Sequence, residues 1–382
     1  MRIGIEAQRI FRPQKHGMDI YALQLIKHLQ EIDHVNDYFI FVKPDEDICL
    51  KPTHNFEIVQ INSLTYADWE QIRLPQYVKD YNIDVLHCTS NTAPLFCSVP
   101  TVVTIHDIIY LNSAFSGGSR YQKLGHYYRK WIVPKVYDKA AKVMTVSNFE
   151  AKTMEGHFKN ADKLNISYNG INPKFNQKST AEVITNVRHE LGLPEKYILF
   201  LGNTAPKKNM IRVLEAYAKY RIESSNPLPL VVVETHCDVV SKMLEDLGHN
   251  EAMLGIHCVG YVSNDKLPVV YQEAELFLYP SLRESFGIPI IEAMASGTPV
   301  ITSSSSSMPE IGQDAASYVD PYSSDMLTSK MLELLSNQDI LSEMKEKGYK
   351  RAKDFSWHNT AQQVRNCYRE VFSGQGDLQR AS

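Results

Sequence analysis

Short apolar segments alternate with helix-forming segments along most of the chain, and this alternation limits the possible folds more than any other feature. In the first half, strand-like runs lie at residues 2–6, 38–43, 84–88, 101–105 and 142–146. Leu, Ile and Tyr recur with helical spacing from Ile20 to Ile32, and Asp19 is the expected N-cap of that helix. Strands that alternate with helices predict parallel sheets covered on both faces.

The pattern restarts after a loop-like segment near residue 170, with strands predicted at 197–202, 229–234, 256–259, 276–279 and 299–302. A chain of 382 residues is also too long for one ordinary core. We therefore predict an α/β protein with two doubly wound domains, residues 1–172 and 173–355, facing each other across a cleft. Residues 356–382 are predicted to form a helix that packs back on the first domain, with a frayed tail.

Composition narrows the class of partner. The chain is 43% apolar and 22% charged, with a formal net charge of −4, whereas a dedicated nucleic-acid binder would be basic. No apolar run approaches the ~20 residues that span a membrane, and the N-terminus lacks the apolar core of a signal peptide. We expect a cytoplasmic protein that is soluble or peripheral on the inner face of the membrane.

The six cysteines are scattered, and reduced thiols are the simplest expectation. Three of them follow a histidine directly, at His87-Cys88, His236-Cys237 and His257-Cys258. Adjacent residues on a strand point to opposite faces, so these pairs are poor chelates and no metal site is predicted.

Ligands of open parallel sheets bind beyond the carboxyl ends of the strands, and two loops there suit phosphate. The first loop, 9–19, is basic and carries Gly17 just before a helix, where backbone could approach a phosphate; an ordinary turn glycine is the alternative. The second, 202–210, places Lys207 and Lys208 before a helix with Asn209 as the expected N-cap. Two cations beside the positive end of a helix favour a diphosphate, although surface lysine pairs are common.

The segment ESFGIPIIEAMASG, residues 284–297, contains two glutamates eight positions apart. Gly287 permits close backbone approach and Pro289 suits a first helical turn, so Glu284 is predicted to lie in a loop and Glu292 in a helix that ends before Gly297. Free backbone N–H groups at residues 286–288 would meet an anion. Carboxylates that flank an anion site suit a nucleotide sugar, because a carboxylate accepts hydrogen bonds from vicinal hydroxyls.

These motifs resemble those of the retaining GT-B glycosyltransferases of family GT4, the glycosyl transferases of group 1. The matching pieces are the E-x7-E segment, AMASGTPVI, the loop GNTAPKKN, IHD at 105–107, VSNFEAKTM at 146–154, YNGIN at 168–172 and MPEIGQDAASYVDP at 308–321. The chain departs from the family pattern in His16-Gly17-Met18, where Gly-Ile-Gly or Gly-Gly is frequent, and in Lys207, where Arg is frequent.

The resemblance implies roles for single residues. Glu292 would hold the ribose hydroxyls and Glu284 the donor sugar, while Lys208 would neutralise the departing diphosphate. His106 would contact the donor sugar, unless it is only a buried strand-end histidine. The implied catalytic residues are His106, Lys208 and Glu284, and the implied donor-binding residues are Gly17, Asn203, Lys207, Lys208, Val262, Glu284, Ser285, Phe286, Gly287, Ile288 and Glu292.

The expected reaction is transfer of a hexosyl group, with mannose from GDP-mannose favoured, to a saccharide or lipid-linked saccharide acceptor in surface polysaccharide synthesis. No nucleophile is evident, which favours a front-face route with retained configuration, without metal or cofactor. One rival is a metal-dependent GT-A enzyme that uses Asp45-Glu46-Asp47, which reads better as a solvated charge run. The others are a nucleotide-sugar 2-epimerase and a non-catalytic sugar-nucleotide-binding paralogue.

Residues 118–142 carry seven Lys or Arg and one acid, interleaved with aromatic residues. Such a segment suits a membrane interface that bears a lipid-linked acceptor. A helix with its aromatics packed inward and its lysines in water fits the same pattern.

Overall fold

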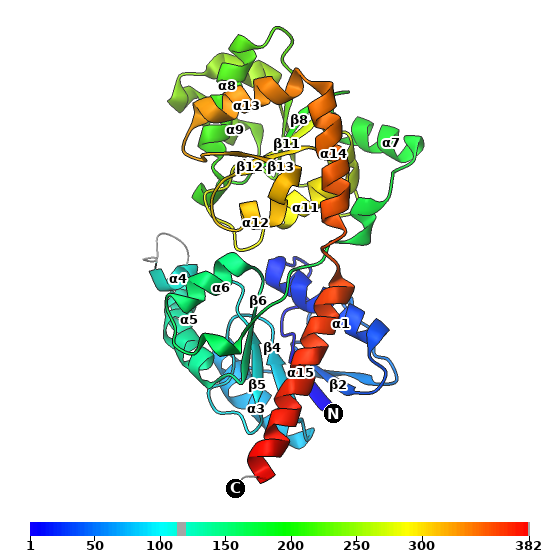
Figure 1. Ribbon diagram of the computed structural model, residues 1–382, viewed down its shortest axis with the longest axis vertical. Helices are drawn as coiled ribbons and strands as arrows, with labels where there is room; N and C mark the ends of the chain where they lie inside the picture. The colour runs from blue at the N-terminus through cyan, green and yellow to red at the C-terminus, as the bar shows by residue number, and fades with distance from the viewer. Residues whose placement is uncertain (113–119, 381–382) are drawn as a thin grey trace. The chain divides into compact units, whose positions relative to one another are not determined.

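The computed structural model describes residues 1–112 and 120–380, and the chain forms two compact units (Figure 1). Unit 1 contains Met1–Gly170 and the chain from Ser356 onward, whereas unit 2 contains Ile171–Phe355. Each unit has its own parallel sheet and its own apolar core, so the predicted pair of Rossmann-like α/β domains is confirmed.

Unit 1 is built on a seven-stranded sheet in the order β3-β2-β1-β4-β5-β6-β7, with every neighbouring pair parallel. The central strands are almost entirely buried, because helices cover both faces. The strands are β1 Arg2–Glu6, β2 Asp37–Val42, β3 Phe56–Gln60, β4 Val85–Cys88, β5 Thr101–Thr104, β6 Lys142–Thr145 and β7 Leu164–Ile166.

Unit 2 is built on a six-stranded parallel sheet in the order β10-β9-β8-β11-β12-β13. The strand order reverses beside β8, and this reversal is where open sheets of this kind form ligand sites. The strands are β8 Ile198–Leu201, β9 Leu230–Val233, β10 Ile256–Gly260, β11 Leu276–Tyr279, β12 Val300–Ser303 and β13 Ala316–Val319.

Helices connect the strands in both units. In unit 1 they are α1 Gly17–Ile32, α2 Tyr66–Asp68, the π-helical η1 Trp69–Arg73, α3 Leu74–Asp80, α4 Ile109–Asn112, α5 Arg120–Lys139, α6 Asn148–Glu155, the 3-10 turn η2 Ala161–Lys163 and α15 Trp357–Arg380. In unit 2 they are α7 Ala181–Leu191, α8 Met210–Glu223, α9 Cys237–Leu247, α10 Leu267–Gln272, α11 Ile288–Ala295, α12 Met308–Gly312, α13 Ser324–Leu335 and α14 Gln338–Ala352, with 3-10 turns η3 Pro173–Asn176, η4 Pro206–Lys208, η5 Asn250–Gly255 and η6 Gln313–Ala315.

Three strands were not predicted from the sequence: β3, β7 and β13. All three lie at an edge of a sheet. Their residues alternate in exposure or are only partly buried, so they do not form the continuous apolar runs that identify central strands.

The first helix begins earlier than predicted. Its N-cap is His16, and Asp19 is the third helical residue, whose Oδ2 accepts a hydrogen bond of 3.0 Å from the His16 N–H. Asp19 also forms an ion pair with Arg9, at 2.9 Å between Oδ1 and Nε. The prediction of Asp19 as N-cap was therefore wrong, because this carboxylate closes the cap from inside the first turn.

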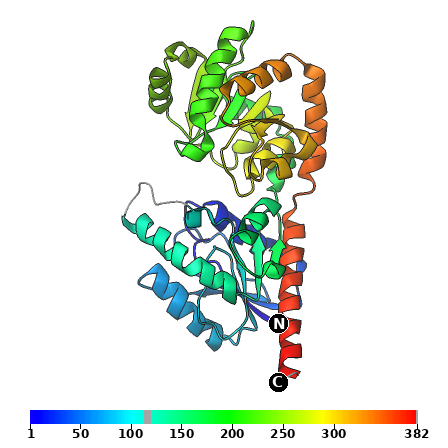
Figure 2. The ribbon, with the colours of Figure 1, turned by 60° about the vertical axis from the view of Figure 1, so that its left-hand side comes forward.

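The C-terminal helix α15 packs on unit 1, as predicted (Figures 1 and 2). It runs along α1 and buries Trp357, Ala361, Val364, Cys367, Tyr368 and Val371 in the core of this unit. Arg365 Nη1 donates to the carbonyl of Ile32 at 2.8 Å and so caps the end of α1. The helix continues to Arg380, so the residues after 372 extend it instead of forming the predicted frayed tail.

Gly170 marks the place where α15 meets the rest of unit 1. A Cβ at this position would lie 2.1 Å from the backbone N and 2.4 Å from the Cγ of Trp357. No side chain fits there unless the start of α15 shifts.

We therefore expect Gly170→Ala to lower the free energy of unfolding of unit 1 by about 3 kcal/mol, as overpacking of a core does. Thermal unfolding followed by circular dichroism measures the change. Gly125→Ala is the matched control, since the nearest atom to its Cβ is 4.0 Å away within α5. Equal melting temperatures for Gly170→Ala and the unaltered protein would contradict this account of the contact.

Candidate functional site

The connection between β11 and α11 divides the two glutamates as the sequence predicts. Gly287 adopts a left-handed conformation, φ 103°, as the N-cap of α11, and Pro289 occupies its first turn. Gly297, φ 80°, follows the end of the helix. Glu284 therefore lies in the loop and Glu292 lies in the second turn of α11.

Glu284 forms the centre of a charged cluster. Its Oε1 is 2.9 Å from Lys208 Nζ and its Oε2 is 3.5 Å from Lys207 Nζ. Lys208 Nζ also donates to the hydroxyl of buried Tyr279 at 2.9 Å. Burial alone would raise the pKa of the Glu284 carboxyl, but Lys208 and Lys207 outweigh it and hold that pKa below its ordinary value. The Glu284 carboxyl is therefore ionised at neutral pH.

Two backbone attachments bring the lysines to this loop. Asn209, the N-cap of α8 as predicted, adopts a left-handed conformation, and its Nδ2 donates to the carbonyls of Pro280 and Pro321. The N–H of Leu282 donates to the Lys207 carbonyl at 2.8 Å. The loop after β8 and the loop after β11 thus form one unit at the carboxyl edge of the sheet.

Glu292 has a different environment from Glu284. Burial raises its pKa to about 7, the Glu234 carboxylate adds to this effect, and a 3.2 Å hydrogen bond from the Tyr271 hydroxyl opposes it. Glu234, in turn, lies 3.5 Å from Asn203 Nδ2. About half of the Glu292 carboxyls are therefore protonated near pH 7.

The predicted backbone cradle lies at the start of α11. Within the described residues, neither the Gly287 N–H nor the Ile288 N–H has a hydrogen-bond acceptor. Phe286 is buried against the ring of Phe355, and Ser285 is half-buried beside it. Such unpaired donors at a helix N-terminus favour an anionic ligand. Val262 is buried just after β10, at the same edge of the sheet.

The other predicted residues, His106 and Gly17, belong to unit 1. His106 is buried, its N–H donates to Asn91 Oδ1 at 2.7 Å, and its Nε2 lies 2.9 Å from the Thr89 carbonyl. A carbonyl only accepts, so Nε2 carries the proton and Nδ1 is left as an acceptor. Burial lowers the pKa of His106, so the ring is neutral. Gly17 is the exposed first residue of α1, with open space where a Cβ would lie.

Sequence reasoning missed Tyr279, Tyr271 and the serine run, defined as residues 303–307. Tyr279 orients Lys208, Tyr271 orients Glu292, and the serine side chains contact the loop that carries Glu284. The five consecutive serines, which begin at the last residue of β12 and lie at the carboxyl edge of the sheet, were a visible signal. The roles of the two tyrosines could not be predicted from the sequence, because most buried aromatic residues in strands and helices contribute only to core packing.

The rival acidic triplet and the His-Cys pairs show no ligand geometry. Asp45 and Glu46 are exposed, and Asp47 is ion-paired with Lys15. All six cysteines are free thiols. Within residues 1–112 and 120–380, no three His, Cys, Asp or Glu side chains lie close enough together to hold a metal ion.

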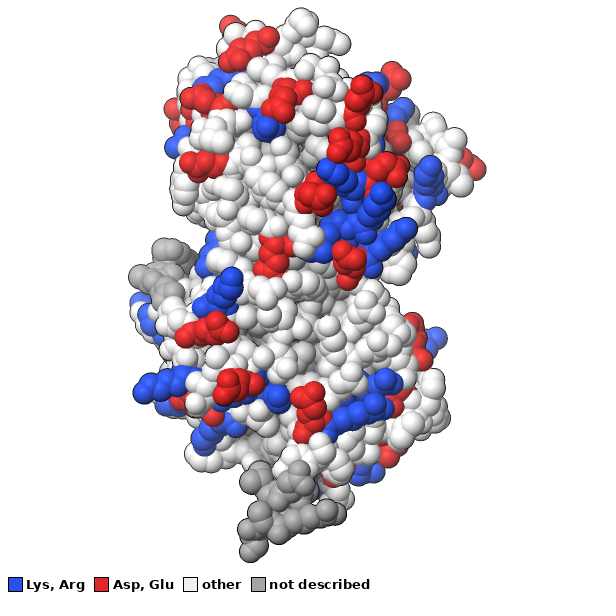
Figure 3. Space-filling view, viewed as in Figure 1, with Lys and Arg blue, Asp and Glu red and all other residues white. Residues whose placement is uncertain are grey.

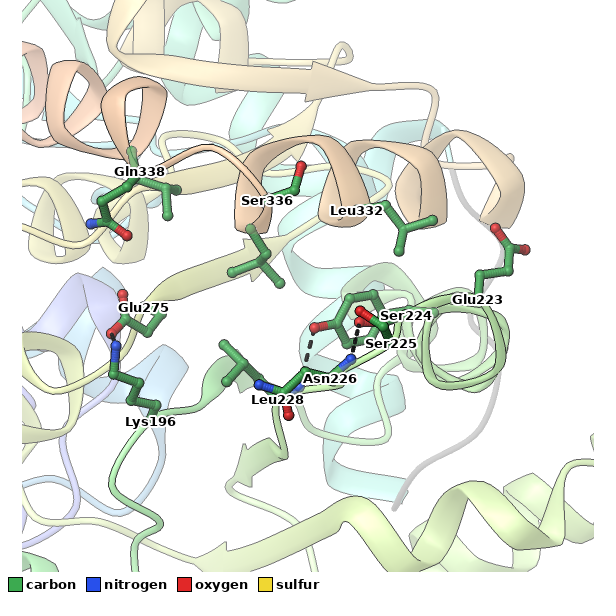
Figure 4. A pocket seen from close by; sticks show the side chains of 13 residues that line it. Lys196, Glu223, Ser224, Ser225, Asn226, Leu228, Glu275, Leu332, Ser336 and Gln338 are labelled. Atoms are coloured by element: carbon green, nitrogen blue, oxygen red, sulfur yellow. Dashed lines mark hydrogen bonds and ion pairs between the residues drawn. The ribbon is translucent and has the colours of Figure 1, made fainter.

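A cavity of about 510 Å³ lies at the opposite, amino-terminal edge of the unit 2 sheet (Figure 4). Lys196 and Glu275 form an ion pair of 3.3 Å at its side, and Leu228, Leu332 and Leu341 contribute apolar lining. It contains none of the predicted site residues. The convergent charges and the unpaired N–H groups at the carboxyl edge therefore define the candidate site better than this cavity does.

Comparison with known families agrees with this geometry. Residues 184–351 match the model of glycosyl transferases group 1, and residues 16–175 match that of Glycosyltransferase Family 4. Together the two matches cover most of unit 1 and unit 2.

Among curated relatives, the chain is 30% identical over 271 residues to O-antigen chain mannosyltransferase B of Escherichia coli, covering 70% of each chain. It is 28% identical to O-antigen chain mannosyltransferase RfbU of Salmonella typhimurium, covering 80% of this chain and 83% of the relative.

Solved structures share the fold at low identity. A glycosyltransferase from Rickettsia africae superposes with a TM-score of 0.74 at 17% identity, over 97% of this chain and 98% of that one. HepE of Anabaena, solved in complex with UDP-glucose, gives 0.73 at 15% identity, over 97% and 100%. Two family models match the chain, a curated relative aligns over most of both chains, and the fold is GT-B. The chain therefore belongs to the group 1 glycosyltransferases of family GT4 and is a glycosyltransferase.

Proposed function

We propose that this glycosyltransferase moves a mannosyl group from GDP-mannose to a hydroxyl of a saccharide or lipid-linked saccharide in surface polysaccharide synthesis, with retained anomeric configuration and no metal. The observation that carries the proposal is the cluster of Lys207, Lys208 and Glu284 beside the open N-terminus of α11. The mannosyltransferase relatives favour the donor sugar.

The charges suit a departing diphosphate. In glycosyl transfer the bond between the sugar and the diphosphate breaks, and negative charge grows on the leaving oxygen. Lys208, fixed by Tyr279, and the Gly287 and Ile288 N–H groups are donors aimed at such charge. Glu284 then exchanges a lysine partner for sugar hydroxyls, and Glu292 accepts from the ribose.

Neither glutamate is placed to act as a nucleophile. Both oxygens of Glu284 are bound to lysines, and the partly protonated Glu292 is assigned to ribose. This favours a front-face route, in which the departing diphosphate takes the proton of the acceptor hydroxyl while that oxygen attacks from the same side. His106 Nδ1 is assigned to a hydroxyl of the donor sugar.

The purified protein, assayed with GDP-, UDP- and dTDP-sugars and a saccharide acceptor, is expected to transfer mannose from GDP-mannose, in the presence of EDTA, to an α-linked product. Lys208→Ala should lower kcat about 10²–10³-fold, because it removes a donor to the developing charge. Glu284→Ala should abolish transfer in a folded protein. Lys196→Ala, which breaks the ion pair at the distant cavity, is the matched control. A new nucleotide sugar formed from donor alone would indicate an epimerase instead.

The pKa of Glu292 gives the donor affinity a pH dependence. Only the ionised carboxylate accepts both ribose hydroxyl bonds, so binding favours loss of its proton. With a pKa of about 7, roughly one tenth of the unliganded groups are ionised at pH 6 and roughly nine tenths at pH 8.

We expect the dissociation constant of the nucleotide sugar to fall about tenfold from pH 6 to pH 8, measured by isothermal titration calorimetry. A nucleotide sugar is the right probe, because a free nucleoside diphosphate has its own ionisation with a pKa of about 6. Glu292→Gln should bind more weakly and without this slope. A slope that persists in Glu292→Gln would assign it to another group.

The outer face of α5 favours contact with an anionic membrane. Leu124, Tyr127 and Trp131 form an exposed stripe along the helix, whereas Tyr128 and Tyr137 pack inward. The alternative prediction, that the aromatic residues of this segment pack inward, is therefore wrong for Tyr127 and Trp131. Residues 118 and 119 of the predicted segment lie outside the described residues.

Lysines flank this stripe: Lys123, Lys130 and Lys135 are exposed, and Lys135 Nζ lies 3.6 Å from the centre of the Trp131 ring. Figure 3 shows basic side chains along the left edge of unit 1, where Figure 1 places α5. None of the described helices is both long and apolar enough to cross a bilayer. This face of α5 therefore suits binding to the membrane surface through its aromatic rings and lysine ammonium groups.

We expect the protein to sediment with vesicles containing phosphatidylglycerol but not with pure phosphatidylcholine vesicles. Since each lysine near an anionic surface adds about 1 kcal/mol, Lys130→Glu with Lys135→Glu should abolish this binding. Lys242→Glu with Lys350→Glu, the same charge change on α9 and α14, is the control. Equal sedimentation of both double variants would refute the contact through α5.

A further inference from the structure

The serine run, residues 303–307, holds the backbone of the loop that carries Glu284. Ser303 Oγ donates to the Ser281 carbonyl at 2.8 Å, and Ser305 Oγ donates to the Leu282 carbonyl at 3.2 Å. Four of the five side chains bond to backbone groups between residues 281 and 286, and only Ser304 does not.

Ser307 has the most constrained side chain of the run. It is fully buried, and its Oγ lies 2.9 Å from the carbonyl of Glu284 and 2.8 Å from that of Phe286. One hydroxyl proton is thus shared between two carbonyls that bracket Ser285. Removing it would take this hydrogen bond from both carbonyls, and the loss of a partner is costly for a buried polar group.

Ser306 completes the attachment from the other side. Its Oγ accepts a hydrogen bond of 3.1 Å from the N–H of Glu284. Its own φ of 51° lies in the left-handed region, where a serine is unusual and strained. This strained conformation occurs where two consecutive side chains, Ser306 and Ser307, form hydrogen bonds with the backbone of Glu284.

These contacts matter because the side-chain partners of Glu284 are the proposed diphosphate ligands. Without donor, Lys207 and Lys208 hold its carboxylate. When a diphosphate engages the ammonium groups, that restraint weakens. The bonds from Ser306 and Ser307 to the main chain do not involve the ligand, so they persist.

We propose that Ser307, assisted by Ser306, is a positioning residue that keeps Glu284 and the start of α11 in place while the donor occupies the lysines. The inference rests on the proposed function, since it presumes that Glu284 meets the donor sugar. It adds a role for two residues that themselves need not touch substrate.

Ser307→Ala is expected to lower kcat with the nucleotide sugar about 10- to 100-fold, because small misplacements in a site are costly. The affinity for free nucleoside diphosphate, which meets the start of α11 but lacks the sugar that Glu284 meets, is expected to fall much less than kcat. Ser306→Gly suits the left-handed backbone and removes the CH2OH group that carries the hydrogen bond, so it should fold and also lower kcat, even if Ser307→Ala is unstable.

Two controls separate positioning from stability. Ser304→Ala changes the exposed neighbour, whose hydroxyl has no partner among the described residues, and should keep full activity. Thr328→Val removes a buried hydroxyl that bonds the carbonyls of Ala216 and Ser324, at 3.1 Å and 2.9 Å, between α8 and α13. It should lower the melting temperature as Ser307→Ala does, with kcat unchanged.

Activity of Ser307→Ala and Ser306→Gly equal to that of Ser304→Ala would overturn the inference, as would an equal loss of kcat in Thr328→Val. Either result leaves the proposed function standing. Full activity in Lys208→Ala is the separate result that would remove the proposed function itself.

Discussion

The contact between the Lys208 ammonium and the Glu284 carboxylate, completed by the Tyr279 hydroxyl, determines the arrangement of the carboxyl edge of unit 2. Withdrawing two charges from water is costly, and their mutual attraction offsets this only when the geometry is well fixed. The chain fixes it from three directions: Asn209 ties the lysine loop to Pro280, Tyr279 supports the ammonium, and the serine run supports the loop backbone.

The same edge gives two carboxyl groups opposite chemistry. Lysines lower the pKa of Glu284, whereas burial near Glu234 raises that of Glu292. One acid is therefore a constant negative charge at neutral pH, and the other changes charge within the physiological range. Their separation by the start of α11, rather than any direct contact, allows the two environments to differ. In a shared environment, one carboxylate would raise the pKa of the other.

Much of the fold and of the candidate site could be predicted from the sequence, and the features that were missed were missed for physical reasons. Central strands were found because burial on both faces requires continuous apolar runs, while the edge strands β3, β7 and β13 lack them. Gly287, Pro289 and Gly297 identified the start and end of α11 through their backbone preferences. Asp19 was misassigned because a capping carboxylate can lie at either end of the first turn. Tyr279 and Ser307 act through contacts between distant strands and loops, which no local pattern records.

The chain passes from unit 1 to unit 2 and returns, with consequences for how the protein is made. The core of unit 1 includes Trp357, Val364 and Tyr368 of α15, which leave the ribosome after all of unit 2, whereas unit 2 is continuous from Ile171 to Phe355. Domains usually complete their folding in the order of synthesis. Here the second unit can finish first, and the sheet of unit 1 exposes an apolar face until α15 has been synthesised and packs on it. A stop codon between unit 2 and α15 would therefore leave unit 2 whole and remove part of the core of unit 1.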